Sequence, residues 1–211
     1  MSFKCERTER LKLFKQAINI DDWTGLKILD YGGNAGNLLK DGIETGEIKE
    51  SDYTCLDVDE KVLVEEHKKY PDAKFISYNR KNPVYNWGGE DRIPLPFEDD
   101  SFDIACAYSV HSHCSYEDFV FDLNELKRVA KIVVTSVVDA EFITLLGYKR
   151  KSDYIEVHPL WSSPHLAMGY RYFIDEDTVE YSQDLIPARC DLLITQYNLD
   201  WLEEQHPEIR I

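Results

Sequence analysis

Short apolar segments alternate with helical patterns along the first two thirds of this 211-residue chain, and this order constrains the fold more than any other feature. The apolar segments are short and rich in β-branched residues, and the first of them is stopped by glycine, as is typical of strands. Because strands that alternate with helices form parallel sheets wound by right-handed crossovers, the order predicts an α/β fold. The predicted strands cover residues 26–31, 52–58, 73–78, 101–110 and 131–139, and the predicted helices cover 5–18, 34–40, 59–70 and 115–130.

The last third of the chain is less regular. Residues 170–185 indicate the end of a strand followed by a short helix, and residues 190–199 indicate a closing strand. No internal repeat, low-complexity run or linker interrupts the chain, which predicts a single domain over residues 1–211 with a leading helix within residues 1–22.

Acidic residues outnumber basic residues by 40 to 24, and the formal net charge is −16. Such a charge repels phosphate backbones and anionic lipid headgroups, so we expect a small-molecule partner and neither nucleic acid nor a membrane. The basic run YKRKSD at residues 148–153 is most simply a solvated loop. Scattered cysteines, a polar N-terminus and no run of about 18 apolar residues predict a cytoplasmic protein. The oligomeric state stays open.

A glycine-rich turn follows the first predicted strand, in KILDYGGNAGNLLK at residues 27–40. Turns of this kind often hold a nucleotide-like cofactor. The dinucleotide spacing G-x-G-x-x-G fails in both registers, because glycine is missing at residues 34 and 37 in one and at residues 35 and 38 in the other. No Gly-Lys-Ser/Thr follows, so the turn is not a triphosphate-binding loop either.

A different spacing, acid-x-Gly-x-Gly-x-Gly, fits the turn better. Asp30, Gly32 and Gly36 occupy three of its four positions, and Asn34 replaces the middle glycine. The second predicted strand ends CLDVDE, which places Asp57 one strand–helix–strand unit beyond the turn. Because a carboxylate has two oxygens, it can accept hydrogen bonds from both hydroxyls of a ribose. The pair of features therefore predicts a site for a cofactor that carries a nucleoside.

Three stretches together resemble the class I S-adenosylmethionine-dependent methyltransferases, in their small-molecule, type 11-like branch. They are KILDYGGNAG, CLDVDE and LPFEDDSFDIACAYSVHSHCSYEDFVFDLNELKRVAK, and the resemblance covers about residues 25–140. It implies a Rossmann-like three-layer sandwich with a mostly parallel, seven-stranded sheet. The last strand of that sheet would be inserted antiparallel, a place that suits residues 190–199.

The resemblance also implies a set of cofactor-binding residues, with S-adenosyl-L-methionine as the cofactor. The methionine end would face the turn, the ribose would bind to the acid after the second strand, and the floor near the sulfonium would come from the end of the fourth strand. The implied residues are Asp30, Gly32 and Gly36 for the methionine, Asp57 for the ribose, Val58 for the adenine, and Tyr108 and Ser109 for the floor. Asn34 must either point away from the cofactor or bond to it.

The acid that usually reads the adenine amino group is not at its expected place after the third strand. Counting forward from that strand gives Asn79, counting back from LPF gives Asp91, and the first is favoured because it directly follows the strand. The long segment between them carries Tyr85 and Trp87, which suit either a pocket wall that stacks on a flat ligand or a loop that packs its own aromatic residues.

Methyl transfer to a hydroxyl often needs a general base, and histidine is suited to that role near neutral pH. The segment YSVHSHC places His113, and as a second candidate His111, beyond the fourth strand, where either could be a base or a structural residue. Although HSHC holds possible metal ligands, a site needs three or four that converge, so we expect no metal. Cys114 has no evident positive neighbour that would make it a nucleophile.

Residues 148–174 lie where such enzymes often build a substrate lid, and they offer His158, Trp161 and His165 as acceptor-binding residues. The sequence thus predicts a methyltransferase that acts on a small molecule, on a hydroxyl of a sugar or secondary metabolite. The alternative is a catalytically inactive module of the same fold that binds a protein partner, which Asn34 and the missing adenine acid both suggest.

Overall fold

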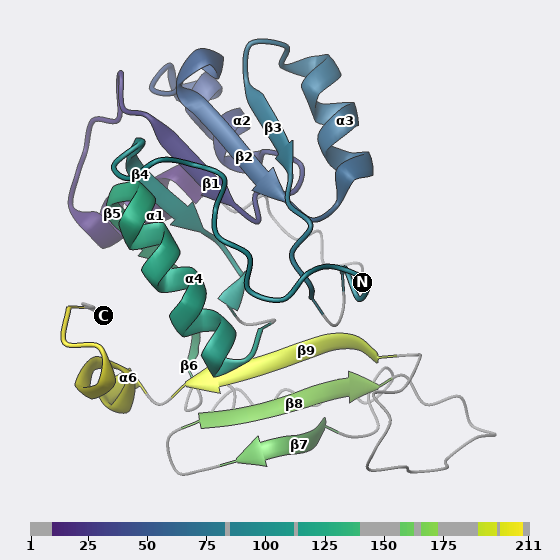
Figure 1. Cartoon of the computed structure of the whole chain (residues 1–211). Coiled ribbons are helices and arrows are strands. Elements are labelled where there is room, and N and C mark those ends of the chain that lie inside the picture. The colour runs from purple at the N-terminus through teal and green to yellow at the C-terminus, as the bar shows by residue number, and fades with distance from the viewer. Residues whose placement is uncertain are drawn as a thin grey trace, which may run out of the picture.

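The computed structural model describes residues 10–82, 85–111, 114–139, 157–162, 166–172, 190–197 and 199–208 (Figure 1). Its helices are α1 (Arg10–Ile18), α2 (Asn37–Thr45), α3 (Glu60–Lys69), α4 (Tyr116–Val129) and α6 (Leu199–Gln205), with a short 3-10 helix η1 at Glu50–Asp52. No helix in these ranges is both long and apolar enough to cross a membrane.

Five parallel strands form the first sheet. They are β1 (Ile28–Tyr31), β2 (Tyr53–Asp57), β3 (Lys74–Ser77), β4 (Phe102–Ala107) and β5 (Ala130–Thr135), in the order β3-β2-β1-β4-β5. Strand order reverses at β1, which lies between β2 and β4. In open α/β sheets ligands bind beyond the carboxyl ends of the strands at such a reversal, so the fold places a binding site beside β1.

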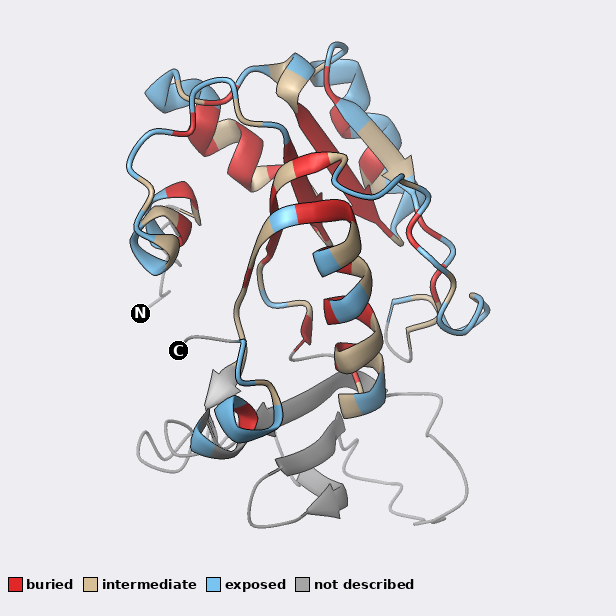
Figure 2. Cartoon of the chain, turned by 60° about the vertical axis from the view of Figure 1, so that its left-hand side comes forward, coloured by how far each residue is buried: buried red, intermediate tan, exposed pale blue. Residues whose placement is uncertain are grey.

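Helices cover both faces of this sheet, and every residue of β1 and β2 is buried, as expected for parallel strands covered on both sides (Figure 2). On one face α1, α2 and α3 pack through residues such as Phe14, Leu39 and Leu63. On the other face α4 packs through Leu126 and Val129 against alternate residues of the same strands. The predicted three-layer α/β fold is therefore confirmed.

Local signals set most helix boundaries. Asp59 caps α3 by accepting hydrogen bonds from the amides of residues 61 and 62, and Ser115 caps α4 by accepting one from the amide of Asp118. The helix expected to start at Asn34 begins at Asn37 instead, because Gly36 adopts φ 62° and ends the glycine turn in a left-handed conformation.

The remaining four strands form a second sheet. They are β6 (Val138–Asp139), β7 (Val157–Ser162), β8 (Leu166–Tyr172) and β9 (Cys190–Tyr197), in the order β6-β9-β8-β7. The predicted closing strand is β9, and it runs antiparallel to β8 and parallel to β6 within this second sheet. The seven-stranded sheet with an inserted antiparallel last strand is thus not confirmed. Only residues 136 and 137 separate β5 from β6, so the chain continues from the first sheet directly into the second.

The second sheet lies on the side of the molecule to which the carboxyl ends of β1–β5 point (Figure 1). The strand expected near residue 170 is β8, whereas the short helix expected after it lies outside the described residues. β7 and β8 form an antiparallel pair within the segment predicted as a substrate lid.

Candidate functional site

A cavity of about 290 Å³ opens beyond the carboxyl ends of β1, β2 and β4. One part of its wall comes from the turn and from the ends of these strands, and the other part comes from α4 and the segment after β3. The lining residues are Arg10, Tyr31, Gly32, Asn34, Leu56, Asp57, Val58, Tyr78, Arg80, Lys81, Asn82, Tyr85, Tyr108, Ser109, Val110, Cys114, Asp118 and Asp122.

The glycine turn is tightly packed against its surroundings. The amide of Gly32 donates a 2.7 Å hydrogen bond to the carbonyl of Leu56, which ties the turn to β2. A Cβ on Gly33 would lie 2.6 Å from the carboxyl carbon of Asp30 and 2.8 Å from Sγ of Cys55. The requirement for glycine therefore extends to position 33, which the spacing argument did not single out, because the contact comes from side chains buried beneath the turn.

Asn34 adopts φ 48°, a left-handed conformation that asparagine tolerates better than most residues. Its backbone amide donates a 2.8 Å hydrogen bond to Oδ2 of Asp57, and Oδ1 of the same carboxylate accepts from the amide of Asp59. Asn34 thus satisfies the conformational need of the missing glycine and helps to orient the predicted ribose-binding acid. The parallel register that pairs Tyr31 with Leu56 makes this contact possible, because it brings the residues after the two strands together.

Asp30 and Gly36 do not line the cavity. The carboxyl of Asp30 is buried beneath the turn, where it accepts a 2.5 Å hydrogen bond from the hydroxyl of Tyr53. Burial raises the pKa of Asp30 to about 6, although the Tyr53 bond and the charge of Arg10 act in the opposite direction. Asp30 therefore supports the turn from below.

Arg10, from the start of α1, contributes a cation to the cavity wall near the turn. Its guanidinium carbon lies 4.7 Å from the centre of the Tyr108 ring. Ser109 adopts φ 60° and its amide donates a 2.7 Å hydrogen bond to Oγ of Ser136. Tyr108 and Ser109 thus line the cavity as predicted, whereas Arg10 was missed because the helical pattern alone does not show which residue of α1 reaches the strand ends.

Neither candidate for reading the adenine amino group lines the cavity. The side-chain amide of Asn79 accepts a hydrogen bond from Asn86 and donates one to Glu90, both 3.2 Å long, within the loop that follows β3. Asp91 is exposed and lies 3.8 Å from Nζ of Lys81. The loop instead presents Asn82 and Tyr85 to the cavity.

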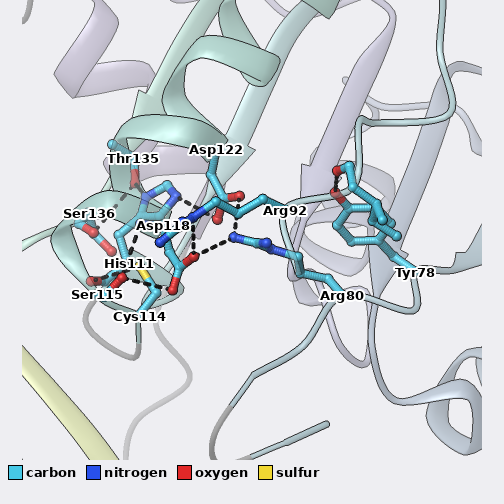
Figure 3. Close-up of polar contacts among 11 residues, drawn as sticks. Tyr78, Arg80, Arg92, His111, Cys114, Ser115, Asp118, Asp122, Thr135 and Ser136 are labelled. Atoms are coloured by element: carbon cyan, nitrogen blue, oxygen red, sulfur yellow. Dashed lines mark hydrogen bonds and ion pairs between the residues drawn. The ribbon is translucent and has the colours of Figure 1, made fainter. Parts of the chain in front are cut away.

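A buried ionic network forms the wall on the side of α4 (Figure 3). The guanidinium of Arg80 lies 2.8 Å from Oδ1 of Asp118 and 3.5 Å from Oδ1 of Asp122. Asp118 also receives Arg92 at 3.0 Å and a 2.8 Å hydrogen bond from the Ser115 hydroxyl. Because Arg80 and Asp122 are 38 or more residues from most of their partners in the chain or on another element, no local pattern announces this network.

Asp122 is the less fully paired of the two carboxyls. Burial raises its pKa to about 7, while the charge of Arg80 and a hydrogen bond from Tyr31 lower it. Cys114 lines the same wall, and burial raises the pKa of its thiol well above the usual range, so it is not an activated nucleophile. The part of the chain that the structure describes contains no cluster of three or more possible metal ligands.

His111 is fully buried and does not line the cavity. Its Nδ1 lies 2.7 Å from Oγ1 of Thr135, and its Nε2 lies 3.9 Å from Oδ2 of Asp122 without a hydrogen-bond partner. Burial lowers the pKa of His111 to about 4, so the ring is neutral near pH 7. His113, the first candidate for a base, lies outside the described residues.

The predicted acceptor-binding residues fall into two groups. Tyr85 lines the cavity, whereas Trp87 is exposed and does not line it, and Nζ of Lys81 lies 5.5 Å from the centre of its ring. His158 and Trp161 belong to β7, and His165 lies outside the described residues. Val58, predicted to pack on the adenine, lines the cavity beside Asp57.

Residues 29–132 match the family model of a methyltransferase domain. The match spans the strands β1–β5 and therefore every part of the cavity wall except Arg10. No curated protein sequence matches the chain.

Three solved structures illustrate the fold-level likeness. The PH0226 protein from Pyrococcus horikoshii OT3 is 17% identical, with a TM-score of 0.50, over 74% of this chain and 68% of that one. A SAM-dependent methyltransferase from Aquifex aeolicus is 22% identical over 58% of this chain and 62% of that one, with a TM-score of 0.38. Magnesium protoporphyrin IX methyltransferase from Synechocystis PCC 6803, with bound SAH, is 14% identical over 67% and 62%, with a TM-score of 0.47. In the last two cases this chain spans less than two thirds of the relative's length, and the first shows a shared fold.

Proposed function

Because the chain belongs to the class I S-adenosylmethionine-dependent methyltransferases, an enzyme family whose cofactor is S-adenosylmethionine, we propose that its cavity binds this cofactor and that the protein methylates a small molecule. The acceptor we propose is a hydroxyl group of a sugar or secondary metabolite. The observation that carries the proposal is the joint geometry of the glycine turn and Asp57, which the cavity brings together with a cation at one side.

The residues of the turn fit the methionine end of the cofactor. The backbone approaches the cavity closely at Gly32, where a Cβ would come within 2.4 Å of a Val110 methyl carbon and narrow the passage. The guanidinium of Arg10 is positioned to receive a carboxylate, because it lines the cavity and no carboxylate of a described residue forms an ion pair with it. A charge-assisted hydrogen bond between guanidinium and carboxylate is among the stronger polar contacts in proteins.

The acid after β2 fits the ribose. Each oxygen of the Asp57 carboxylate accepts one backbone hydrogen bond, and each retains capacity for a second. In this arrangement Val58 packs against the adenine, as the resemblance implies. Asn79 and Asp91 could read the adenine amino group only after leaving their present partners, so Asn82 and Tyr85 are the better placed residues of that loop.

When bound, the cofactor supplies an electrophilic methyl group, and the protein has to hold the acceptor in line with it and receive a proton. We propose that the acceptor enters between the cavity and the segment of residues 148–174, since β7 and β8 lie on the side to which the parallel strands point. His158, Trp161 and His165 are its proposed contacts there. His113 remains the proposed base of the loop after β4, and His111 could act only through the residues that surround it.

The inactive-module alternative loses part of its support. Asn34 was one of its two motives, and the left-handed conformation of that residue together with its bond to Asp57 accounts for the substitution without any loss of the site.

Calorimetric titration with S-adenosylhomocysteine tests the proposed function. We expect a dissociation constant in the micromolar range, and no binding at several hundred micromolar would refute it (about 5 kcal/mol of binding free energy at that limit). Arg10→Gln should weaken S-adenosylhomocysteine and leave 5′-methylthioadenosine unaffected, because the second ligand lacks the carboxylate. Equal weakening of both ligands would show that Arg10 does not contact the carboxylate.

A further inference from the structure

The carboxyl of Asp122 lines the cavity although its side chain is only 6% exposed. It projects from the second turn of α4 and faces the end of β1, the segment after β3 and the loop after β4. The short ion pair of Arg80 goes to Asp118, and Asp122 is left with a 3.5 Å contact to the same guanidinium. A buried carboxyl so incompletely paired retains the capacity to accept a further hydrogen bond from the cavity.

His111 stands directly behind this carboxyl (Figure 3). Its ring lies between Tyr31, which it stacks against at 6.2 Å, and Phe119, whose ring it meets edge-on at 5.0 Å. With Nδ1 held by Thr135, the unpartnered Nε2 faces Oδ2 of Asp122 at 3.9 Å. Within the described residues, a proton can therefore reach the His111 ring from the cavity only through Asp122.

The charged and titratable groups around Asp122 come from every element packed against it. They are Tyr31 from β1, Tyr78, Arg80 and Arg92 from the segment between β3 and β4, His111 and Cys114 from the loop after β4, and Asp118 from α4 itself. Burial outweighs the charge of Arg80, and the pKa of Asp122 rises to about 7. The carboxyl thus exchanges its proton in the pH range where a general base is most effective.

We propose that Asp122 is the proton acceptor of the methyl-transfer reaction and that His111 positions it from behind. This inference rests on the proposed function, with a hydroxyl compound as acceptor and S-adenosylmethionine as methyl donor. The acceptor's O–H bond breaks and its proton moves to a carboxylate oxygen of Asp122. The oxygen forms a bond to the methyl carbon, and the electron pair of the broken carbon–sulfur bond remains on sulfur.

Carbon-13 NMR of protein labelled at aspartate carboxyls tests this assignment without an acceptor. In the S-adenosylhomocysteine complex, one aspartate signal should titrate near pH 7, and it should be absent in Asp122→Asn. His111→Phe should shift the midpoint of that titration, because it removes Nε2 but keeps a ring of similar size. Glu117→Gln is the matched control on α4, since its side chain is exposed and does not line the cavity; it should leave the signal unchanged.

Two results would overturn the inference. In one, no aspartate signal of the complex titrates above pH 6. In the other, Asp122→Asn weakens S-adenosylhomocysteine tenfold or more, which would assign Asp122 to the cofactor site. Should Asp122→Asn fail to fold, Thr135→Val keeps the carboxyl and should still shift its titration by releasing Nδ1 of His111. If the wild-type protein does not bind S-adenosylhomocysteine at all, the proposed function fails first.

A kinetic arm uses radiolabelled S-adenosylmethionine and a panel of phenols, catechols and sugars as acceptors. Asp122→Asn should lower kcat by roughly 100-fold with little change in KM, and should remove the rise of kcat through pH 7 seen in the wild-type protein. His111→Phe should lower kcat less and move the midpoint of that rise. Wild-type turnover in Asp122→Asn would refute the role of the carboxyl.

Discussion

The two walls of the cavity are built in different ways. The wall at the ends of β1 and β2 depends on backbone conformation: Gly32 and Asn34 adopt positive φ, and backbone amides orient the Asp57 carboxylate. The wall beside α4 depends on buried side-chain charges, with Arg80 between Asp118 and Asp122. The first wall fits a ligand of fixed shape, whereas the second keeps a titratable group next to the cavity, and these are the separate needs of binding a cofactor and of moving a proton.

The largest effect is expected from removing the cation of the charged wall. Arg80→Met leaves two carboxyls near each other in a buried site, and we expect it to lower the free energy of unfolding by about 3–5 kcal/mol. Arg92→Met is the matched control, because Arg92 contacts the same Asp118 at 3.0 Å but is about half exposed; its loss should cost about 0–1 kcal/mol. Urea denaturation of both variants measures the difference, and equal effects would show that burial does not distinguish the two pairs.

The backbone-built wall can be tested through its one charged side chain. Asp57→Ala should weaken S-adenosylhomocysteine by about 1.5–3 kcal/mol, because hydrogen bonds to a charged group are lost. Calorimetry provides the measurement, and thermal unfolding of the free variant controls for damage to the turn that Asp57 holds. Unchanged affinity in a folded variant would show that the ribose lies elsewhere.

The charged wall should also make stability depend on pH. The folded-state pKa of Asp122 is about 7 and its ordinary value is 3.8, so between these values the native state holds a proton that the unfolded chain has released. Stability from this group is therefore present at low pH and is lost as the pH rises from about 4 to about 7, by at most about 1.4 kcal/mol per pH unit. Denaturant midpoints measured from pH 5 to 8 should fall more steeply for wild type than for Asp122→Asn. Parallel curves would contradict the assignment.

The smallest effect concerns the position where the turn departs from the glycine spacing. Asn34→Ala should lower the free energy of unfolding by about 1 kcal/mol, because alanine tolerates the left-handed conformation poorly. Asn34→Gly should be close to wild type in both stability and S-adenosylhomocysteine affinity, since the bond to Asp57 comes from the backbone. A loss of affinity in Asn34→Gly alone would reveal a direct role for the asparagine side chain.

The sequence by itself determined the order of strands and helices, the turn and the position of Asp57. These features depend on local rules: apolar periodicity, glycine where φ is positive, and a strand–helix–strand unit whose parallel register places the residues after β1 and β2 side by side. For this reason the contact between Asn34 and Asp57 crosses 23 residues and yet follows from a pattern in the chain.

Only the tertiary structure decided the rest of the cavity. The reach of Arg10 from α1, the pairing of Arg80 with α4, and the burial of His111 behind Asp122 each depend on how one element packs against another. The closing strand shows the same limit, because β9 could pair with the first sheet or with β8, and local propensity is equal for both. Packing between elements distant in the chain selects one arrangement among several that satisfy the same local pattern, so the titratable wall became visible only in the folded molecule.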